Sequence, residues 1–332
     1  MTPSDKQRAV RDLVVEHPQF TQTVKALERF HFPVKGGLPA RGTIAAVIGD
    51  SRTGKTFATK HYASRFPPSV GETGVIRPVV YVDMPPDGGG GMRGILEAFA
   101  NSLGLQVTLR MTNPMLASMV MRALVSQKIE LVLLDEFDQV FRENDKRLLG
   151  AGRGLLRKIV DLNTLSVVCI GLPGAYDLIK ADSQLVGRGG LPFQQLRPYE
   201  GQGSTEWPTF RLVCDAFDQG MPFSIQAGLG KTDFAARLHW VTKGNIGHLK
   251  FYIEAAAAEA INDDADTLRL AHFAAVYDVR KPIGQTFNPF THELSLAPKP
   301  TPDQRKLKQG AGRTVFSKTP EPNAWAHGGE VA

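Results

Sequence analysis

Residues 43–66 read TIAAVIGDSRTGKTFATKHYASRF, and they hold the strongest fold signal in the chain. An apolar run from Ile44 to Ile48 enters Gly49–Thr56, which fits the pattern G-x-x-x-x-G-K-T, and FATKHYASRF can continue as a helix. In such a loop the glycines let backbone N–H groups curl around phosphate oxygens, and the helix that follows adds its positive N-terminal dipole. The stretch therefore predicts a strand, a phosphate-binding loop and a helix in direct succession.

The loop supplies most of the candidate nucleotide ligands. Lys55 is expected to place its charge on the β- and γ-phosphates, and the Thr56 hydroxyl is expected to bind magnesium. We therefore expect ATP and Mg²⁺ as cofactors. The full set of expected nucleotide-binding residues in the loop is Gly49, Asp50, Ser51, Arg52, Thr53, Gly54, Lys55 and Thr56.

A second motif lies about eighty residues further on, where the apolar run LVLL (131–134) ends in Asp135 and Glu136. A buried parallel strand that ends in two carboxylates presents both at the carboxyl edge of the sheet, beside the phosphate loop. Asp135 is expected to bind the nucleotide and to hold the magnesium ion through its water shell. Glu136 is the candidate general base that orients the attacking water.

The pattern along the chain predicts an α/β fold. Short apolar runs alternate with helical patterns up to about residue 197, which is typical of a three-layer parallel sheet. Beyond Pro198 the patterns are helical. The expected strands are 43–49, 79–84, 130–137, 166–171 and 191–196, and the expected later helices are 209–219, 232–243, 248–262 and 266–279.

Composition narrows the class of protein further. The net charge of +6 is compatible with nucleic-acid binding but does not demonstrate it, and half of it lies in the Pro-, Lys- and Gly-rich tail from Leu296. Cys169 and Cys214 offer no disulfide framework or metal-ligand spacing, and Cys169 is expected in the core. No run approaches the roughly 18 apolar residues of a membrane span. We expect a cytoplasmic protein with no membrane partner.

Taken with the two motifs, several segments resemble the AAA+ superfamily and, more closely, its TniB and TnsC transposition ATPases, with phage Mu B as a more distant relative. The resemblance runs from about Val24 to Phe290. Besides the phosphate loop it rests on four segments in order, which are ELVLLDEFDQVF (130–141), SVVCIGLPGAYDLIKADSQLVGRG (166–189), TKGNIGHLKFYIEAAAAEA (242–260) and FNPF (287–290).

The resemblance implies a composite active site. The family uses an arginine that reaches into the neighbouring subunit's ATP, and the matching residue is Arg188, which is therefore a candidate catalytic residue. Many AAA+ proteins carry a polar sensor residue after the fourth strand, whereas this chain has Leu172, which puts efficient hydrolysis in doubt. The lid lacks a sensor arginine, and Asn245, His248 or Lys250 are the candidate substitutes.

The resemblance also implies where DNA binds. The family's DNA-facing loops follow the second strand, which here is the segment from Pro85 to Gly94 with four consecutive glycines. The candidate phosphate contacts are Arg93, Thr108, Arg110 and Thr112. One basic side chain, hydroxyls and free amides suit a contact that tracks phosphates without reading the sequence.

These inferences divide the chain into an N-terminal extension (1–23), a nucleotide-binding α/β domain (24–197), a helical lid (198–290) and a basic tail (291–332). The expected protein is an ATPase that forms a homo-oligomer, as a ring or helical filament, on double-stranded DNA and recruits a transposase, with a target-selection protein as a further candidate partner. Two alternatives remain open at this point. One is a STAND-like nucleotide switch in bacterial defence or signalling, and the other is a scaffold that binds ATP without hydrolysing it.

Overall fold

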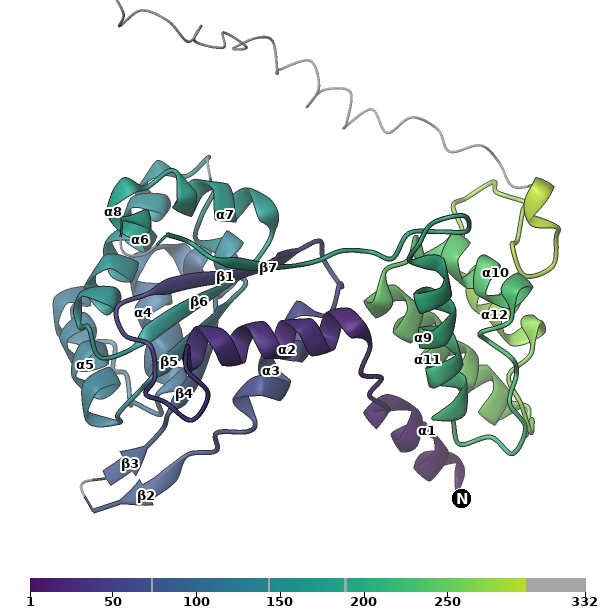
Figure 1. The fold of residues 1–332 in the computed structure, drawn as a ribbon, viewed down its shortest axis with the longest axis horizontal. Coiled ribbons are helices and arrows are strands. Elements are labelled where there is room, and N and C mark those ends of the chain that lie inside the picture. Colours follow the sequence, from purple (N-terminus) through teal and green to yellow (C-terminus); the bar gives the residue numbers. More distant parts are fainter. Residues whose placement is uncertain (73, 143, 188–189, 297–332) are drawn as a thin grey trace, which may run out of the picture.

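The computed structural model describes residues 1–72, 74–142, 144–187 and 190–296 and places them in two bodies joined by an extended connection (Figure 1). The first body is built on a five-stranded sheet in the order β4-β5-β6-β1-β7, with all neighbours parallel. Its strands are β1 (Ile44–Gly49), β4 (Val79–Asp83), β5 (Leu131–Asp135), β6 (Ser166–Gly171) and β7 (Phe193–Leu196). The expected α/β fold with a parallel sheet is confirmed.

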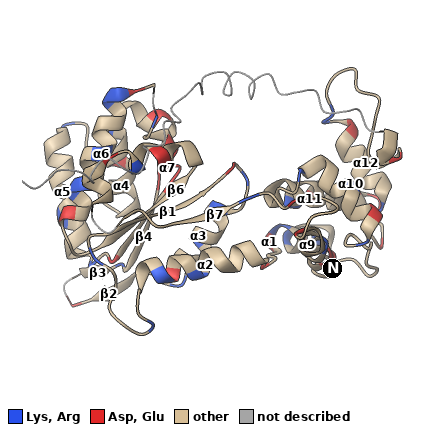
Figure 2. Cartoon of the chain, turned by 45° about the horizontal axis from the view of Figure 1, so that its top comes forward, with Lys and Arg blue, Asp and Glu red and all other residues tan. Residues whose placement is uncertain are grey.

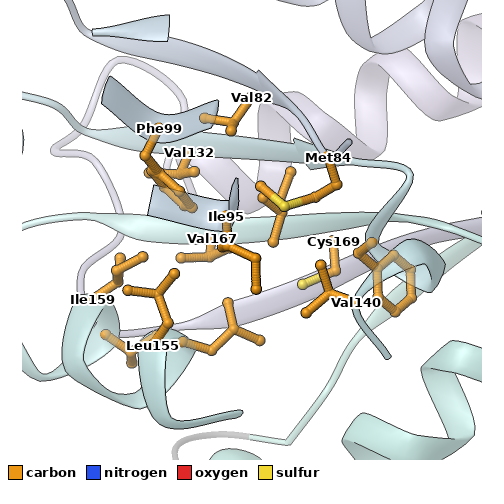
Figure 3. Close-up of a cluster of buried hydrophobic side chains, with 14 of the residues drawn as sticks. Val82, Met84, Ile95, Phe99, Val132, Val140, Leu155, Ile159, Val167 and Cys169 are labelled. Atoms are coloured by element: carbon orange, nitrogen blue, oxygen red, sulfur yellow. The ribbon is translucent and has the colours of Figure 1, made fainter. Parts of the chain in front are cut away.

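Two layers of helices bury the sheet. On one face α2 (Pro18–His31) and α3 (Lys55–Ala63) enclose a cluster that includes Leu27, Tyr62 and Val168. The other face carries a larger cluster, part of which is drawn in Figure 3. The helices that cover this second face are α4 (Met92–Ser102), α5 (Asn113–Ser126), α6 (Lys146–Asp161), α7 (Pro173–Lys180) and α8 (Ser183–Val186). Cys169 is fully buried here, as expected.

The five strands carry charge only at their carboxyl ends. Figure 2 shows the sheet almost free of charged residues, which lie instead on helices and loops. The two exceptions are Asp83 and Asp135, each the last residue of its strand. Because charged groups are costly to bury without partners, the middle of each strand is uncharged and chemistry is confined to the carboxyl edge of the sheet.

The second body is helical, as expected, and we refer to it as the lid. It contains α9 (Trp207–Gln219), α10 (Thr232–Thr242), α11 (Ile246–Asn262) and α12 (Leu270–Asp278), and the 3₁₀ turn η3 (Leu294–Leu296) follows. The segment FNPF closes its core, since Phe290 stacks on Phe273 and Asn288 donates from Nδ2 to the Ala274 carbonyl over 3.1 Å.

The N-terminal segment joins both bodies. Helix α1 (Pro3–Asp12) begins with a capping box between Thr2 and Asp5, and its Val10 packs into the lid core. Helix α2 packs on the sheet, so the expected boundary between residues 23 and 24 falls inside it. Between these helices His17 Nδ1 lies 3.0 Å from the Tyr199 hydroxyl, which ties the segment to the connection between the bodies.

Three small features had no signal in the sequence pattern. The antiparallel pair β2 (Ser69–Gly71) and β3 (Gly74–Ile76) consists of two three-residue strands. The 3₁₀ turn η1 (Pro86–Gly90) lies in the glycine loop, which we define as residues 85–91, and η2 (Phe137–Gln139) follows β5. Among the described residues no helix is long and apolar enough to cross a membrane.

Candidate nucleotide site

The phosphate loop (residues 49–56) connects β1 to α3 as expected. Lys55 is buried, and its Nζ donates to the carbonyls of Gly49 and Asp50 over 2.8 Å each. Burial lowers the pKa of Lys55, while the nearby carboxylates of Asp135, Glu136, Asp138 and Asp50 act in the opposite direction. The lysine is therefore held inside the loop and surrounded by acidic groups.

Asp135 is fixed on both carboxylate oxygens. Its Oδ1 accepts from the backbone N–H of Glu136 over 2.8 Å, and its Oδ2 accepts from the hydroxyl of Tyr81 on the neighbouring strand β4. The residue is only 1% exposed. Tyr81 was not identified in the sequence because a tyrosine in an apolar strand has no motif of its own.

Glu136 lies between the end of β5 and the turn η2. It has a left-handed backbone conformation (φ 53°) and leads into η2, whose Phe137 is fully buried. Burial, followed by the charges of Asp138 and Asp135, raises the pKa of the Glu136 carboxyl. A raised pKa suits a group that must accept a proton from water.

One cavity of about 690 Å³ brings Lys55 and Glu136 together. Such a volume is typical of a cofactor site. It is lined by Ser51, Arg52, Gly54, Lys55, Thr56, Phe57, Lys60, Glu136, Asp138, Gln139, Gly171, Leu172 and Gly247. The cavity thus gathers the loop, the segment after β5, the end of β6 and the start of α11.

The residues at the cavity fit a magnesium ion by their chemistry. Thr56 lines the cavity, and the Asp135 carboxylate lies behind Glu136 at the end of β5. Among the described residues no group of three or more His, Cys, Asp or Glu gathers as a metal site. Magnesium in phosphoryl-transfer sites is held by one or two protein oxygens together with substrate phosphates, so the donor set of Thr56 and Asp135 is sufficient in kind.

The lid docks on the phosphate loop through the first turn of α11. Asn245 Nδ2 donates to the Ser51 carbonyl over 2.9 Å, and the Gly247 N–H donates to the Arg52 carbonyl over 2.8 Å. The Asn245 side chain also caps α11. The other two sensor candidates lie further along the same helix.

Lys250 donates to the carbonyls of Arg11 and Leu13 and so holds the N-terminal segment. His248 is exposed at the start of α11. Its pKa is lowered by partial burial and by the charge of Arg52. Of the three candidates, Asn245 is therefore the one that contacts the phosphate loop directly.

A second cavity of about 150 Å³ adjoins the first and shares Gly54, Phe57 and Gly247 with it. The N-terminal segment contributes Leu13, Val14, Val15, His17 and Phe20, and the lid contributes Phe217, Ile246 and Lys250. This second cavity, which we call the apolar pocket, is lined mainly by hydrophobic side chains, whereas the first is charged.

The candidate DNA contacts form a separate group around α4 and the start of α5. Arg93, on α4, donates to the carbonyls of Met111 and Thr108 over 2.6 and 3.3 Å and pairs with Glu97 over 2.7 Å. Thr112 accepts from the Met115 N–H and caps α5. Thr108 and Arg110 are exposed on the same stretch of chain, which we call the basic loop (residues 104–112).

The glycine loop is wound in a left-handed sense, with positive φ at Asp87 and at each of the four glycines that follow. Glycine adopts this conformation without steric cost, which explains the run of four. Arg142 pairs with the Asp87 carboxylate and also donates to Gln139 Oε1, and the Asp87 N–H donates to that same oxygen over 3.4 Å. Gln139 lines the nucleotide cavity, so this network joins the glycine loop to the site.

Arg188, the candidate arginine acting on a neighbouring subunit, lies outside the described residues. The structure brings the expected phosphate loop together with Asp135 and Glu136, and it places Arg93, Thr108, Arg110 and Thr112 in a second group.

Comparison with known proteins agrees with this geometry. The family model described as "TniB: Bacterial TniB protein" matches residues 7–195, more than half of the 332 residues. No curated protein matches the chain.

Solved structures of ORC and Cdc6 proteins share the fold. The ORC2 protein of Aeropyrum pernix, solved as ADPNP–ADP complexes, is 12% identical with a TM-score of 0.60 over 82% of this chain and 71% of that one. The ORC1 protein of the same organism, in complex with DNA, is 16% identical with a TM-score of 0.57 over 80% and 66%. Cdc6p of Pyrobaculum aerophilum is 14% identical with a TM-score of 0.51 over 80% and 68%. At these identities the likeness is one of fold.

Proposed function

The chain belongs to the TniB family of bacterial transposition proteins, and from this premise we propose that it is an ATP-hydrolysing regulator of transposition. It binds double-stranded DNA without sequence specificity, forms a homo-oligomer on target DNA and recruits a transposase. The observation that carries the proposal is the single cavity that Lys55, Thr56 and Glu136 line together, with Asp135 behind them.

The loop residues bind the triphosphate. Lys55 Nζ exchanges its two carbonyl partners for phosphate oxygens, and the amides of residues 49–56 with the N-terminus of α3 hold the remaining charge. Glu136 accepts a proton from the attacking water. Thr56 and Asp135 would hold Mg²⁺, which would supply positive charge to the phosphates.

The apolar pocket suits the adenine base. Phe20 and Phe57 lie with ring centroids 5.6 Å apart at its wall, and the lid and the residues just before α2 supply most of the remaining lining. Because the pocket is built from both bodies, base binding stabilises their docked arrangement. We propose the same division of the chain for this arrangement, with the first boundary moved ahead of α2: residues 18–197 and 198–290 are the two bodies, residues 1–17 bridge them and residues 291–332 are the tail.

The basic loop makes the DNA contact in this proposal. Arg110 is exposed and carries the charge, whereas the guanidinium of Arg93 is committed to two carbonyls of the basic loop and to Glu97. Arg93 is therefore proposed to hold the loop in shape, while Arg110 and Thr108 touch phosphates. The DNA-bound ORC1 relative supports DNA binding on this fold only by analogy.

The network from Asp87 through Arg142 to Gln139 couples this surface to hydrolysis. Asp87 belongs to the glycine loop, which leads into α4, and Gln139 lines the nucleotide cavity together with Glu136. DNA bound at the basic loop would act on the glycine loop through Arg93 and α4, and a shift of the glycine loop would move Gln139. We propose that turnover is stimulated by DNA along this route.

An ATPase assay with and without duplex DNA, followed by electron microscopy of the mixtures, tests the proposal. DNA-stimulated turnover together with rings or filaments on DNA is the expected result. Turnover that ignores DNA favours a nucleotide switch in defence or signalling, and ATP binding without turnover favours a scaffold. Either outcome contradicts the proposal. Pull-down of a transposase or target-selection protein with and without the tail then tests recruitment.

A further inference from the structure

The end of β6 presents an apolar side chain to the nucleotide cavity. Leu172 follows Gly171 directly, lines the cavity and is 38% exposed. A leucine side chain offers a water molecule no hydrogen bond, so whatever orients water on this side of the cavity must come from another residue.

Asp138 lies beside Leu172 and also lines the nucleotide cavity. Its Oδ1 accepts from the Leu172 N–H over 3.2 Å, so the carboxylate is held against the end of β6 although it belongs to η2. A Cβ atom on Gly171 would lie 2.5 Å from the same oxygen, and only a glycine there permits the approach.

The turn η2 directs Asp138 and Glu136 into one space. Phe137 between them is fully buried and anchors the turn, while the residues on either side of it both line the cavity with Lys55. The carboxylates of Glu136 and Asp138 therefore both offer hydrogen-bond acceptors to the nucleotide cavity. Within the described residues no protein hydrogen bond to Asp138 Oδ2 is present, so one oxygen is anchored and the other is available.

We propose that Asp138 is a second acceptor for the attacking water and takes the part that a polar side chain at position 172 would otherwise play. The inference rests on the proposed ATPase activity. The water donates one hydrogen bond to Glu136 and one to Asp138, which aims its oxygen lone pair at the γ-phosphorus. The new O–P bond forms as the bond from phosphorus to the bridging oxygen of ADP breaks, and the proton passes to Glu136. Asp138 holds the other hydrogen without taking it.

The Asn variant separates this role from simple anchoring of the β6 end. In Asp138→Asn the amide oxygen still accepts from the Leu172 N–H, but the NH₂ group replaces the free acceptor with a donor. Asp145→Asn is the matched control, since Asp145 likewise accepts a backbone N–H, that of Leu148 over 2.8 Å, but caps α6 and does not line the cavity.

The experiment measures kcat, KM and the equilibrium affinity for ATP with duplex DNA present. We expect Asp138→Asn to lower kcat by about tenfold or more, with KM and affinity within about twofold of the parent, because only transition-state geometry is impaired. Asp145→Asn should leave all three unchanged. Leu172→Thr introduced into Asp138→Ala should restore part of kcat by returning a polar group to the site.

Two results overturn the inference while leaving the proposed ATPase intact. The first is an Asp138→Asn variant with parental kcat, whether or not Asp138→Ala is impaired, because anchoring alone would then explain the hydrogen bond to Leu172. The second is a decrease of ATP affinity in Asp138→Asn that matches its decrease of kcat. If the parent protein shows no ATP turnover, or only turnover that Glu136→Gln does not lower, the proposed ATPase activity itself is refuted. This inference then fails with it.

Discussion

Lys55 makes two hydrogen bonds to its own loop, and a bound triphosphate must replace them. Lys55→Ala is therefore expected to weaken ATP binding by about 100-fold, the order of a charge-assisted hydrogen bond to phosphate. A fluorescent-nucleotide titration measures the affinity. Lys25→Ala, which removes an exposed lysine from α2, is the control. Equal ATP affinities of the two variants would show that Lys55 does not bind the phosphates.

Glu136 lies at the carboxyl edge of the sheet with its pKa raised by burial and by neighbouring carboxylates. Glu136→Gln removes the proton acceptor but keeps the shape, so ATP affinity should persist while kcat falls by about 100-fold or more. Steady-state assays measure kcat, and nucleotide titration measures the affinity for ATP. The variant should also accumulate as DNA-bound oligomers under the electron microscope, and unchanged turnover would reject Glu136 as the base.

His17 is buried at the junction of the two bodies, where burial lowers its pKa to about 4. The unfolded chain takes up this proton near the ordinary value of about 6.5. Between these two pH values the unfolded state binds more protons, so stability falls as pH is lowered through the window, by up to about 3 kcal/mol for this residue. Urea unfolding at pH 7, 6 and 5 measures the trend.

His17→Gln should flatten this pH dependence, and His61→Gln on α3 is the comparison. His31 contributes in the same direction, because burial also lowers its pKa to about 4. A pH dependence that is the same in His17→Gln and the parent would contradict the assignment.

At the scale of elements, most strands were predictable and the small turns were not. Strands β1, β4, β5 and β6 are nearly continuous apolar runs because both faces are buried, and this leaves a plain pattern in the sequence. Strands β2 and β3 are mostly exposed and three residues long, so they leave no recognisable hydrophobic pattern in the sequence.

The residues of the nucleotide site likewise include some that the sequence identified and some that it did not. Lys55 and Glu136 belong to motifs, whereas Tyr81 and Asp138 are placed by hydrogen bonds to Asp135 and to the Leu172 N–H, which only the folded sheet brings near.

The basic loop provides a prediction that separates charge from position. Arg110→Ala should weaken binding to all duplex sequences and lower the slope of log affinity against log salt by about one unit for each phosphate that is no longer neutralised. Arg93→Lys keeps the charge but lacks the planar fork whose separate nitrogens reach the Met111 and Thr108 carbonyls and Glu97 together, so it should weaken binding with the slope largely preserved. Titrations at several salt concentrations compare the variants.

Removal of residues 297–332 is the control for that experiment, because it deletes much of the net charge without touching the basic loop. DNA binding should survive the deletion. Should it vanish with the tail while Arg110→Ala binds normally, DNA is held by the tail. A slope that falls in Arg93→Ala but not in Arg93→Lys would instead make Arg93 a direct phosphate ligand.

At the scale of the whole molecule, the nucleotide cavity is open to solvent on the side of Glu136 and Arg52, both of which are exposed. A neighbouring subunit can complete it there. A guanidinium supplied by Arg188 of that neighbour would stabilise charge on the γ-phosphate and make turnover depend on assembly. Arg188→Ala should accordingly bind ATP as the parent does, yet assemble and hydrolyse poorly.

A mixing experiment tests whether the site is shared between subunits. Lys55→Ala protein has an intact Arg188, and Arg188→Ala protein has an intact phosphate loop, so some interfaces in a mixed oligomer contain both. Turnover of the mixture on DNA should exceed the sum of the two variants measured separately at the same total concentration. The Lys55→Ala/Arg188→Ala double variant mixed with Arg188→Ala is the matched control, because none of its interfaces is complete. If the two mixtures have the same turnover while both proteins co-assemble on DNA, each subunit hydrolyses ATP without an arginine from its neighbour.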